Sequence, residues 1–267
     1  MVRVAVAGAA GRMGSRIATQ AVENPAIELV GAFERSGHEK IGEDIGTVIG
    51  IGKTGVKLSG TVDESMKDAD VVIDFTAVEA TLDNLKKCSA AGKAMVIGTT
   101  GFSADKKKEI ESLTRNIPCV MAPNMSVGVN LLFKVLKDVA RVLGDDYDIE
   151  IIEAHHRLKK DAPSGTALKL AQVVAEAMGR NLDEVAVYER KGLIGERKKK
   201  EIGIQTIRAG DIVGEHTVLF GTVGERVEIT HKASSRDTFA KGAMRAALWV
   251  HGKKPGLYDM MDVLGLK

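Results

Sequence analysis

The first half of the chain alternates short apolar runs with segments in which apolar residues recur every three or four positions. Between the first two apolar runs, Met13, Ile17 and Ala21 fall on one face of a helix. The runs themselves are nearly continuous, which is typical of parallel strands buried on both faces of a sheet. Right-handed crossovers between them predict a doubly wound, Rossmann-like α/β domain. The expected strands cover residues 2–9, 27–34, 70–76, 94–101 and 118–124.

The second half has a different layout. Residues 147–156 alternate apolar and polar positions, and residues 202–234 read as several strands separated by glycine-containing turns. These patterns predict an α+β domain with a mixed or antiparallel sheet. The polar, basic segment 190–203 lies between them, and we expect it to be a mobile loop.

The last helical pattern, which follows residue 235, is expected to return to the first domain. The predicted organisation is a dinucleotide-binding domain of residues 1–125 and 235–267, with a substrate-binding and oligomerisation domain, residues 126–234, inserted into it. Because an open sheet of this size usually pairs with another copy, we expect a symmetric oligomer that assembles through the inserted domain.

Composition excludes several classes of function. The 267 residues carry a net charge of only +2, which argues against nucleic-acid binding. No apolar run reaches the roughly 18 residues of a transmembrane helix, and the N-terminus lacks the pattern of a signal peptide. Cys88 and Cys119 lie in apolar-leaning segments and suit buried thiols in a reducing compartment. We therefore expect a cytoplasmic protein with no membrane partner.

The turn after the first expected strand carries Gly8, Gly11 and Gly14 and opens a helix. Glycines at such a turn let backbone N–H groups approach a pyrophosphate, although the spacing G-x-x-G-x-x-G is not the commoner G-x-G-x-x-G and is also compatible with a purely structural turn. Glu34 ends the second strand, where a carboxylate can accept hydrogen bonds from the adenosine ribose. Arg35 follows and can meet a 2′-phosphate, so both NADH and NADPH are expected cofactors.

The carboxyl ends of two later strands are expected to line the same cofactor crevice. Ligands of open α/β sheets bind beyond the carboxyl ends of the strands. Residues 98–101 and 122–125 lie at such ends and are mostly small. They leave room for a nicotinamide ring, and they are also compatible with ordinary turns.

The stretch EAHHRLKKDAPSGTA, residues 153–167, places His155, His156 and Lys159 just before a helix. Ser164 suits the N-cap of that helix, and the N–H groups of the first turn, at the positive end of the dipole, suit a carboxylate. A histidine can deliver a proton near neutral pH, and a lysine supplies a localised positive charge. The set suits a small dicarboxylate that is protonated as it is reduced; the alternative is a solvated basic turn. No third ligand has the spacing for a metal site.

These motifs closely resemble the 4-hydroxy-tetrahydrodipicolinate reductase (dihydrodipicolinate reductase) family. The residues that carry the resemblance are EAHHRLKKDAPSGTAL, VAGAAGRMG, GTTGF, APNMSVGVN, RAGDIVGEHTV and ERVEITHKASSRDTFAKGA. They cover nearly the whole chain in order, and the segment 186–200 matches least. The resemblance implies an NAD(P)H-dependent oxidoreductase of the diaminopimelate route to lysine, typically a homotetramer assembled through its substrate domains.

The resemblance also implies a reaction and the residues that carry it. The 4-hydroxy ring is dehydrated and then receives a hydride from NADH or NADPH, while His155 protonates the neighbouring carbon and gives tetrahydrodipicolinate. Lys159 is the implied catalytic lysine, and the implied contacts to substrate carboxylates are His156, Gly165 and Thr166. The implied cofactor contacts are Gly8, Ala9, Ala10, Gly11, Arg12, Met13, Glu34, Arg35, Gly98, Thr99, Thr100, Ala122, Pro123, Asn124 and Met125.

Two other interpretations compete with this one. The first is another nicotinamide enzyme of the same fold, such as a homoserine or aspartate-semialdehyde dehydrogenase. The latter needs a nucleophilic cysteine, and neither Cys88 nor Cys119 lies in a catalytic-looking turn. The second is a nucleotide sensor without enzymatic activity, in which the His-His-Lys cluster would have no role.

Overall fold

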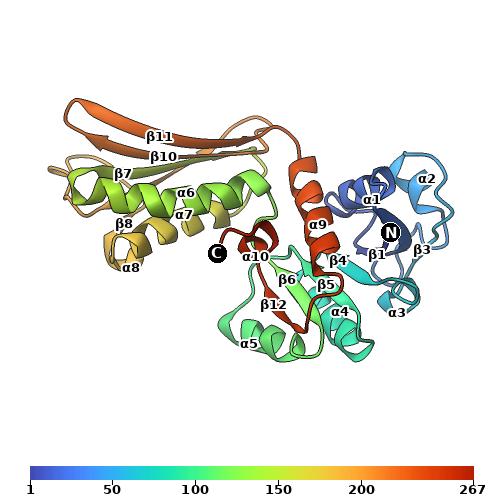
Figure 1. Ribbon diagram of the computed structural model, residues 1–267. Helices are drawn as coiled ribbons and strands as arrows, with labels where there is room; N and C mark the ends of the chain where they lie inside the picture. Colours follow the sequence, from blue (N-terminus) through green and yellow to red (C-terminus); the bar gives the residue numbers. More distant parts are fainter. The chain divides into compact units, whose positions relative to one another are not determined.

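The computed structural model describes all 267 residues, which divide into two compact units. The first unit consists of Met1–Val127 and Arg236–Lys267, and the second of Gly128–Ser235. The chain thus leaves the first unit once and returns to it with its last segment (Figure 1).

A seven-stranded parallel sheet forms the centre of the first unit. Its strands are β1 (Val2–Ala7), β2 (Ile27–Phe33), β3 (Leu58–Ser59), β4 (Val71–Asp74), β5 (Ala94–Ile97), β6 (Pro118–Met121) and β12 (Gly256–Tyr258). They lie in the order β12-β6-β5-β4-β1-β2-β3, and every neighbouring pair is parallel. Apart from β12 this is the strand order of a dinucleotide-binding sheet, with its switch point between β1 and β4. The predicted Rossmann-like architecture is confirmed; the short strands β3 and β12 were not expected.

Helices cover both faces of this sheet, which explains why its strands lack polar alternation. One hydrophobic core joins the sheet to α1 (Gly14–Glu23), α2 (Ile45–Ile49), α9 (Asp237–Val250) and α10 (Met260–Leu264). The other joins it to α3 (Val62–Ser65), α4 (Val78–Ala90) and α5 (Ala104–Leu113). Although α9 comes near the end of the chain, it packs beside α1 (Figure 1).

The second unit contains a five-stranded mixed sheet, which confirms the predicted α+β character. Its strands are β7 (Asp148–His155), β8 (Ala186–Val187), β9 (Ile202–Arg208), β10 (Gly214–Thr222) and β11 (Glu225–Ala233), in the order β11-β10-β7-β9-β8. The central strand β7 pairs antiparallel with β10 and parallel with β9. The helical segments are α6 (Val127–Leu143), a short 3₁₀ turn (Gly144–Asp146), α7 (Gly165–Ala177) and α8 (Leu182–Val185).

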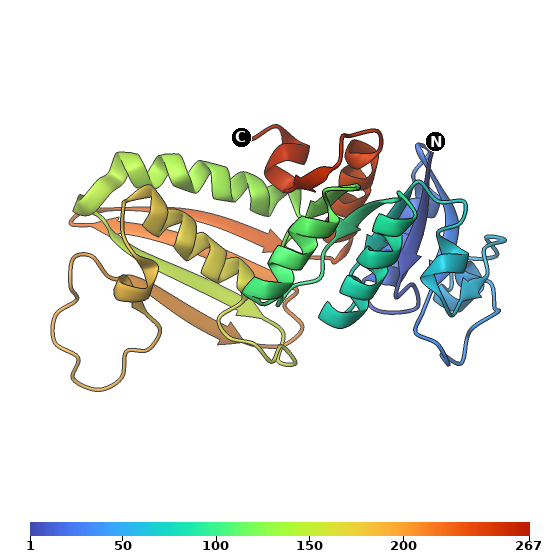
Figure 2. The same cartoon turned by 90° about the horizontal axis from the view of Figure 1, so that it is seen from below.

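Only one face of this second sheet is covered by helices (Figures 1 and 2). The core beneath α6 and α7 includes Ile149, Ile151 and Val218. Because side chains alternate along a strand, Ile152 and Leu219 project from the opposite face. None of the helices in the structure combines the length and the apolar character needed to cross a membrane.

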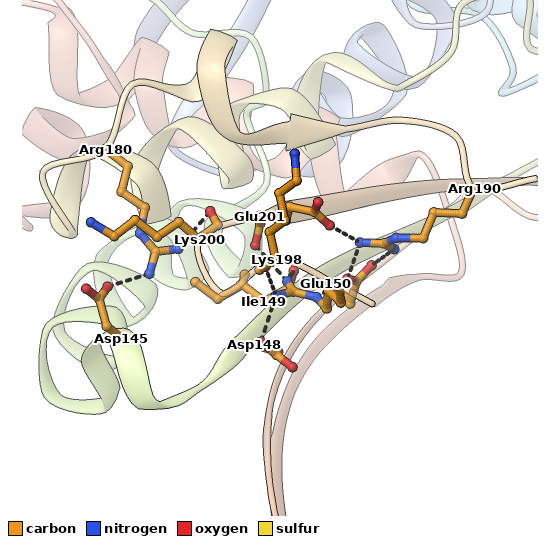
Figure 3. A network of polar contacts seen from close by, with 10 residues as sticks. Asp145, Asp148, Ile149, Glu150, Arg180, Arg190, Lys198, Lys200 and Glu201 are labelled. Atoms are coloured by element: carbon orange, nitrogen blue, oxygen red, sulfur yellow. Dashed lines mark hydrogen bonds and ion pairs between the residues drawn. The ribbon is translucent and has the colours of Figure 1, made fainter. Parts of the chain in front are cut away.

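The segment between β8 and β9, for which the sequence predicts a mobile loop, makes side-chain contacts with the sheet. Figure 2 shows it as a long loop, but two of its arginines are paired. Arg190 donates to both carboxylate oxygens of Glu150 at 2.8 Å (Figure 3). Arg197 donates to Glu150 at 3.2 Å and to Asp148 at 2.7 Å. Gly203 leaves space for this carboxylate, since a Cβ there would lie 1.8 Å from a Glu150 oxygen. Two points of the loop are therefore anchored to β7.

Candidate active site

The glycine-rich turn lies at the switch point of the first sheet, directly after β1. Gly8 has a φ of +59°, which glycine adopts without strain. A Cβ on Gly14 would lie 1.9 Å from the carbonyl oxygen of Gly8, so α1 can begin this close to the strand only with glycine. The N-cap residue Met13 makes no side-chain cap hydrogen bond. The N-terminus of α1 therefore has no capping side chain, which fits a bound pyrophosphate.

Glu34 is brought against this turn from the end of β2. One of its carboxylate oxygens accepts a hydrogen bond from Ala10 N at 3.2 Å, and the other accepts from Arg35 N at 3.4 Å. Arg35 itself is exposed. A carboxylate and an exposed guanidinium beside a glycine turn fit the ribose and a 2′-phosphate of a dinucleotide.

A buried carboxylate, Asp74, links the next strand ends; the sequence places residues 74–76 at this edge of the sheet but does not reveal the hydrogen bonds of Asp74. Asp74 ends β4, and one of its oxygens accepts hydrogen bonds from Thr76 N at 2.9 Å and Thr99 Oγ1 at 3.4 Å. Its other oxygen accepts from Asn84 Nδ2 at 2.8 Å. Gly98 is required nearby, because a Cβ there would lie 2.1 Å from the ring of Phe75. Asp74 thereby ties the loop that contains Thr99 to the end of β4.

The remaining expected cofactor positions differ in the exposure of their side chains. The side chains of Ala9, Ala122 and Met125 pack in the hydrophobic core, so these positions can offer a ligand only backbone groups. Positions with exposed side chains are Arg12, Thr100 and Pro123. Asn124 Oδ1 accepts a hydrogen bond from Ser126 N at 2.8 Å.

In the second unit, β7 ends at His155 and α7 begins ten residues later at Gly165. Ser164 Oγ accepts a hydrogen bond from Ala167 N at 3.1 Å, which confirms the predicted N-cap. A Cβ on Gly165 would meet nothing within 4 Å. The first turn of α7, which also contains Thr166, therefore borders open space in which a carboxylate can sit.

His155 is bonded to Glu153, which lies on the same face of β7 and is fully buried. The distance from His155 Nδ1 to Glu153 Oε2 is 2.5 Å. Arg208 of β9 donates to both oxygens of the carboxylate at 2.8 Å, and Ser164 N donates at 3.0 Å. Burial would raise the pKa of Glu153, but the hydrogen bonds from Arg208 and His155 outweigh it, so the pKa is lowered.

The ionised carboxylate fixes the tautomer of His155. A carboxylate can only accept hydrogen bonds, so Nδ1 of His155 carries the proton. Burial lowers the pKa of His155, even though the hydrogen bond to Glu153 raises it. Without a ligand the ring is therefore mainly neutral near pH 7, and an anion bound beside it would favour the protonated form.

Two further groups complete this cluster. Lys159 Nζ donates to both oxygens of Asp161 at 2.8 Å, a partner that the sequence interpretation did not include. His156 Nδ1 is buried and has no hydrogen-bond partner. His155, His156, Lys159 and Gly165 thus belong to one unit of the structure.

His216 was also missed, since it lies on β10, far from the motif in sequence. Its Nε2 is 3.0 Å from Ser164 Oγ, and its ring meets that of His155 edge-on with 5.2 Å between centroids. Burial lowers the pKa of His216 to about 3, with a smaller contribution from His155. The neutral imidazole of His216 therefore contacts both the ring of His155 and the N-cap residue Ser164 of α7.

Neither cysteine suits nucleophilic catalysis. Both thiols are free and buried. Burial raises the pKa of Cys88 to about 12 and raises the pKa of Cys119 as well. Thiolate chemistry of the aspartate-semialdehyde dehydrogenase type therefore has no candidate residue here.

The first unit has a parallel sheet with a glycine-rich turn at its switch point, and the second has a mixed sheet that carries a histidine-lysine cluster. This combination is typical of two-unit oxidoreductases that use a nicotinamide cofactor. The chain belongs to the dihydrodipicolinate reductase family. The family profile described as "Dihydrodipicolinate reductase, N-terminus" matches residues 2–125, and that described as "Dihydrodipicolinate reductase, C-terminus" matches residues 128–264. The family has a nucleotide-binding Rossmann domain and uses NADH or NADPH.

Individual relatives agree with this assignment. The chain is 62% identical to the 4-hydroxy-tetrahydrodipicolinate reductase of Syntrophobacter fumaroxidans and 60% identical to that of Hahella chejuensis, each over all 267 residues and the whole of the relative. Among solved structures, it resembles the dipicolinate-bound dihydrodipicolinate reductase from Paenisporosarcina sp. TG-14. That match has a TM-score of 0.72 and 26% identity, and it covers 98% of each chain.

The buried His216 makes the protein less stable in acid. The pKa of His216 is about 3 in the folded protein and roughly 6.5 in an unfolded chain. Between these values the unfolded chain binds a proton that the folded protein does not. The contribution of His216 to the free energy of unfolding is therefore fully present above about pH 6.5. As the pH falls from there towards 3, this group lowers the free energy of unfolding by about 1.4 kcal/mol per pH unit. Urea unfolding at several pH values between these limits should show that the free energy of unfolding falls less steeply with decreasing pH in His216→Gln than in the wild type.

The control for this experiment is His251→Gln, which changes an exposed histidine. It should keep the wild-type pH dependence. Identical slopes for the wild type and His216→Gln would contradict the assignment of a neutral, buried His216.

Proposed function

We propose that this chain reduces 4-hydroxy-tetrahydrodipicolinate to tetrahydrodipicolinate with NADH or NADPH, in the diaminopimelate route to lysine. The observation that carries the proposal is the His155–Glu153 pair beside the N-terminus of α7, in a chain of the reductase family. The dipicolinate bound to the Paenisporosarcina relative supports a small dicarboxylate as the ligand.

The substrate carboxylates bind where the second unit concentrates positive charge and N–H donors. One carboxylate lies at the first turn of α7 and contacts Gly165 and Thr166. The half-buried side chain of His156 contacts a carboxylate as well. Lys159 exchanges its bond to Asp161 for one to the bound anion.

His155 supplies the proton. The bound dicarboxylate favours the imidazolium form, whose Nε2–H then faces the ring while Nδ1–H remains on Glu153. The 4-hydroxyl group first leaves as water, and a bound reduced nicotinamide would then supply a hydride to the dehydrated ring. His155 delivers its proton to the neighbouring ring carbon and becomes neutral, and Lys159 stabilises the negative charge that develops meanwhile.

The cofactor binds to the first unit through the glycine turn and the strand ends. The contacting residues are Gly8, Ala9, Ala10, Gly11, Arg12, Met13, Glu34, Arg35, Gly98, Thr99, Thr100, Ala122, Pro123, Asn124 and Met125. The absence of a capping side chain on α1 and the position of Glu34 against the turn support this proposal.

A coupled assay tests the proposed activity directly. Pyruvate, aspartate semialdehyde and the synthase generate the substrate in place, and the loss of cofactor absorbance is followed with NADH and with NADPH. Turnover that requires both the synthase and this protein supports the proposal. Cofactor binding without turnover would instead favour a nucleotide sensor.

Substitutions within the basic cluster should separate its roles. His155→Gln should lower kcat by about 10²–10⁴-fold, as expected for the loss of one proton donor, while cofactor affinity is retained. Lys159→Ala should also lower kcat, whereas His156→Ala should act mainly on KM, as a ground-state contact does. Steady-state kinetics at several pH values check this. Near-normal turnover in all three variants would show that the cluster is only a solvated turn.

Cofactor choice should depend on Arg35. Its guanidinium can pair with a 2′-phosphate that NADH lacks, so Arg35→Ala should weaken NADPH binding by about 1–3 kcal/mol and leave NADH binding largely unchanged. Titrations with the two cofactors provide the comparison within one variant. Equal losses for both cofactors would exclude Arg35 as the phosphate contact.

A homotetramer assembled through the second unit is the oligomer that we propose. Alternation along the strands places the half-buried Ile152 and Leu219 on the face of the sheet that the helices leave uncovered, and the anchored 190–203 loop exposes Leu193 fully. Such uncovered apolar surface favours self-association. Sedimentation equilibrium should give the mass of four chains. Leu219→Glu should reduce this mass, while Val22→Glu, on α1 of the first unit, should not; a monomeric wild type would refute the proposal.

We further propose that the protein resides in the cytoplasm. Its two buried, unpaired cysteines suit a reducing compartment. Recovery of the protein outside the cytoplasmic fraction of fractionated cells would contradict this location.

A further inference from the structure

We infer that Glu153 is a positioning residue for proton donation: it holds His155 as the Nδ1–H tautomer and leaves Nε2 to face the bound ring. The inference rests on the proposed role of His155 as proton donor. Glu153 itself touches neither the substrate nor the cofactor, because it is fully buried beneath His155.

The carboxylate of Glu153 is held so that it cannot turn. Oε2 accepts from His155 Nδ1 at 2.5 Å and from Arg208 at 2.8 Å. Oε1 accepts from Arg208 at 2.8 Å, Ser164 N at 3.0 Å and Thr206 Oγ1 at 3.2 Å. These donors come from β7, β9 and the N-cap of α7, so most of the acceptor capacity of the group is used. A carboxylate fixed in this way also fixes the plane and the tautomer of the imidazole that donates to it.

A glycine lies beside the other edge of the His155 ring. A Cβ on Gly214 of β10 would lie 3.1 Å from His155 Nε2 and 3.5 Å from its Cδ2, closer than ordinary packing allows for the nitrogen. Glycine at this position therefore spares the reactive nitrogen from contact with a side chain. The ring of His216 packs edge-on against His155 at an interplanar angle of 74° and limits its tilt.

The charges around His155 give Glu153 a second effect. The groups that face the ring are Glu153 on β7, Arg208 on β9, His216 on β10 and Lys159 in the connection to α7. Burial, Lys159 and Arg208 lower the pKa of His155, and Glu153 raises it. Loss of the Glu153 charge would remove the influence that raises the pKa and leave those of burial, Lys159 and Arg208, which lower it, so less imidazolium would be present near neutral pH.

The test is Glu153→Gln, read out in the protein without cofactor. Histidine ring-nitrogen NMR shifts report the tautomer and titration of His155, whose signal among six histidines is assigned with His155→Gln. The expected result is loss of the Nδ1–H tautomer and titration at lower pH than in the wild type. The alkaline limb of the kcat/KM profile should move to lower pH in parallel. Turnover near neutral pH should fall at least about tenfold. This loss should remain smaller than the loss in His155→Gln, which is expected to be roughly 10²–10⁴-fold.

Glu150→Gln is the matched control. Glu150 lies on the same strand and is also held by arginines, but it faces away from His155. This variant should leave the tautomer and titration of His155 and the kcat/KM profile of the enzyme unchanged.

Because Glu153→Gln leaves Arg208 without its partner and can impair folding, Glu153→Gln/Arg208→Gln serves as the second variant. It should shift the titration in the same direction by a smaller amount.

The outcomes distinguish this inference from the proposed function. An unchanged tautomer and titration in folded Glu153→Gln, or in the double variant, would overturn the positioning role while leaving the reductase activity intact. A shifted titration with unchanged kcat/KM would overturn it as well. The proposed function itself fails instead when wild-type protein shows no turnover in the coupled assay.

Discussion

The bidentate ion pair between Glu153 and Arg208 is the interaction on which the candidate substrate site depends. It joins β7 to β9, and Arg208 also donates to the carbonyl oxygen of Asp161 at 2.6 Å. Glu153 also accepts a hydrogen bond from the backbone N–H of Ser164. The nine-residue connection between β7 and α7, residues 156–164, is therefore held at both ends and in its middle. A buried pair of this kind contributes to stability only when its polar atoms are satisfied, and here the same bonds that satisfy the carboxylate orient His155.

The first unit depends on a different constraint, which is the close approach of backbone segments. Gly14 lets α1 begin directly over Gly8, and Gly98 accommodates the ring of Phe75. Asp74 then links the ends of β4 and β5 through hydroxyl and amide donors. These features shape a surface of backbone groups beside the switch point, which suits a ligand recognised mainly through phosphates and ribose.

The sequence predicts those parts of the structure whose signals are local. Continuous apolar runs identify five parallel strands, and the Pro-Ser-Gly-Thr motif identifies the N-cap Ser164. Strands β3 and β12 contain only two and three residues, which is too short for periodicity to show. Arg208 and His216 reach His155 through strand pairing, in which His155 lies opposite Arg208 in β9. The spacing of residues along the chain does not predict which residues of two paired strands lie opposite each other.

The 190–203 segment illustrates the same limit. Its charge and glycine content are typical of a solvated loop, and Glu150 alone looks like an outward-facing residue of an alternating strand. Only the fold brings Arg197 and Arg190 onto that carboxylate; Figure 3 shows the contact of Arg190. Asp161, two residues after Lys159, was within reach of local reasoning and was overlooked as a partner.

The central claim is that a dicarboxylate bound at α7 brings a proton onto His155. Calorimetric titration of pyridine-2,6-dicarboxylate into the protein, near neutral pH and in buffers of different ionisation enthalpy, measures this directly. The account predicts an uptake approaching about one proton per bound ligand, because a neutral His155 becomes charged beside the anion. The uptake should be lost in His155→Gln. Binding without proton uptake, or uptake that persists in His155→Gln, would contradict it.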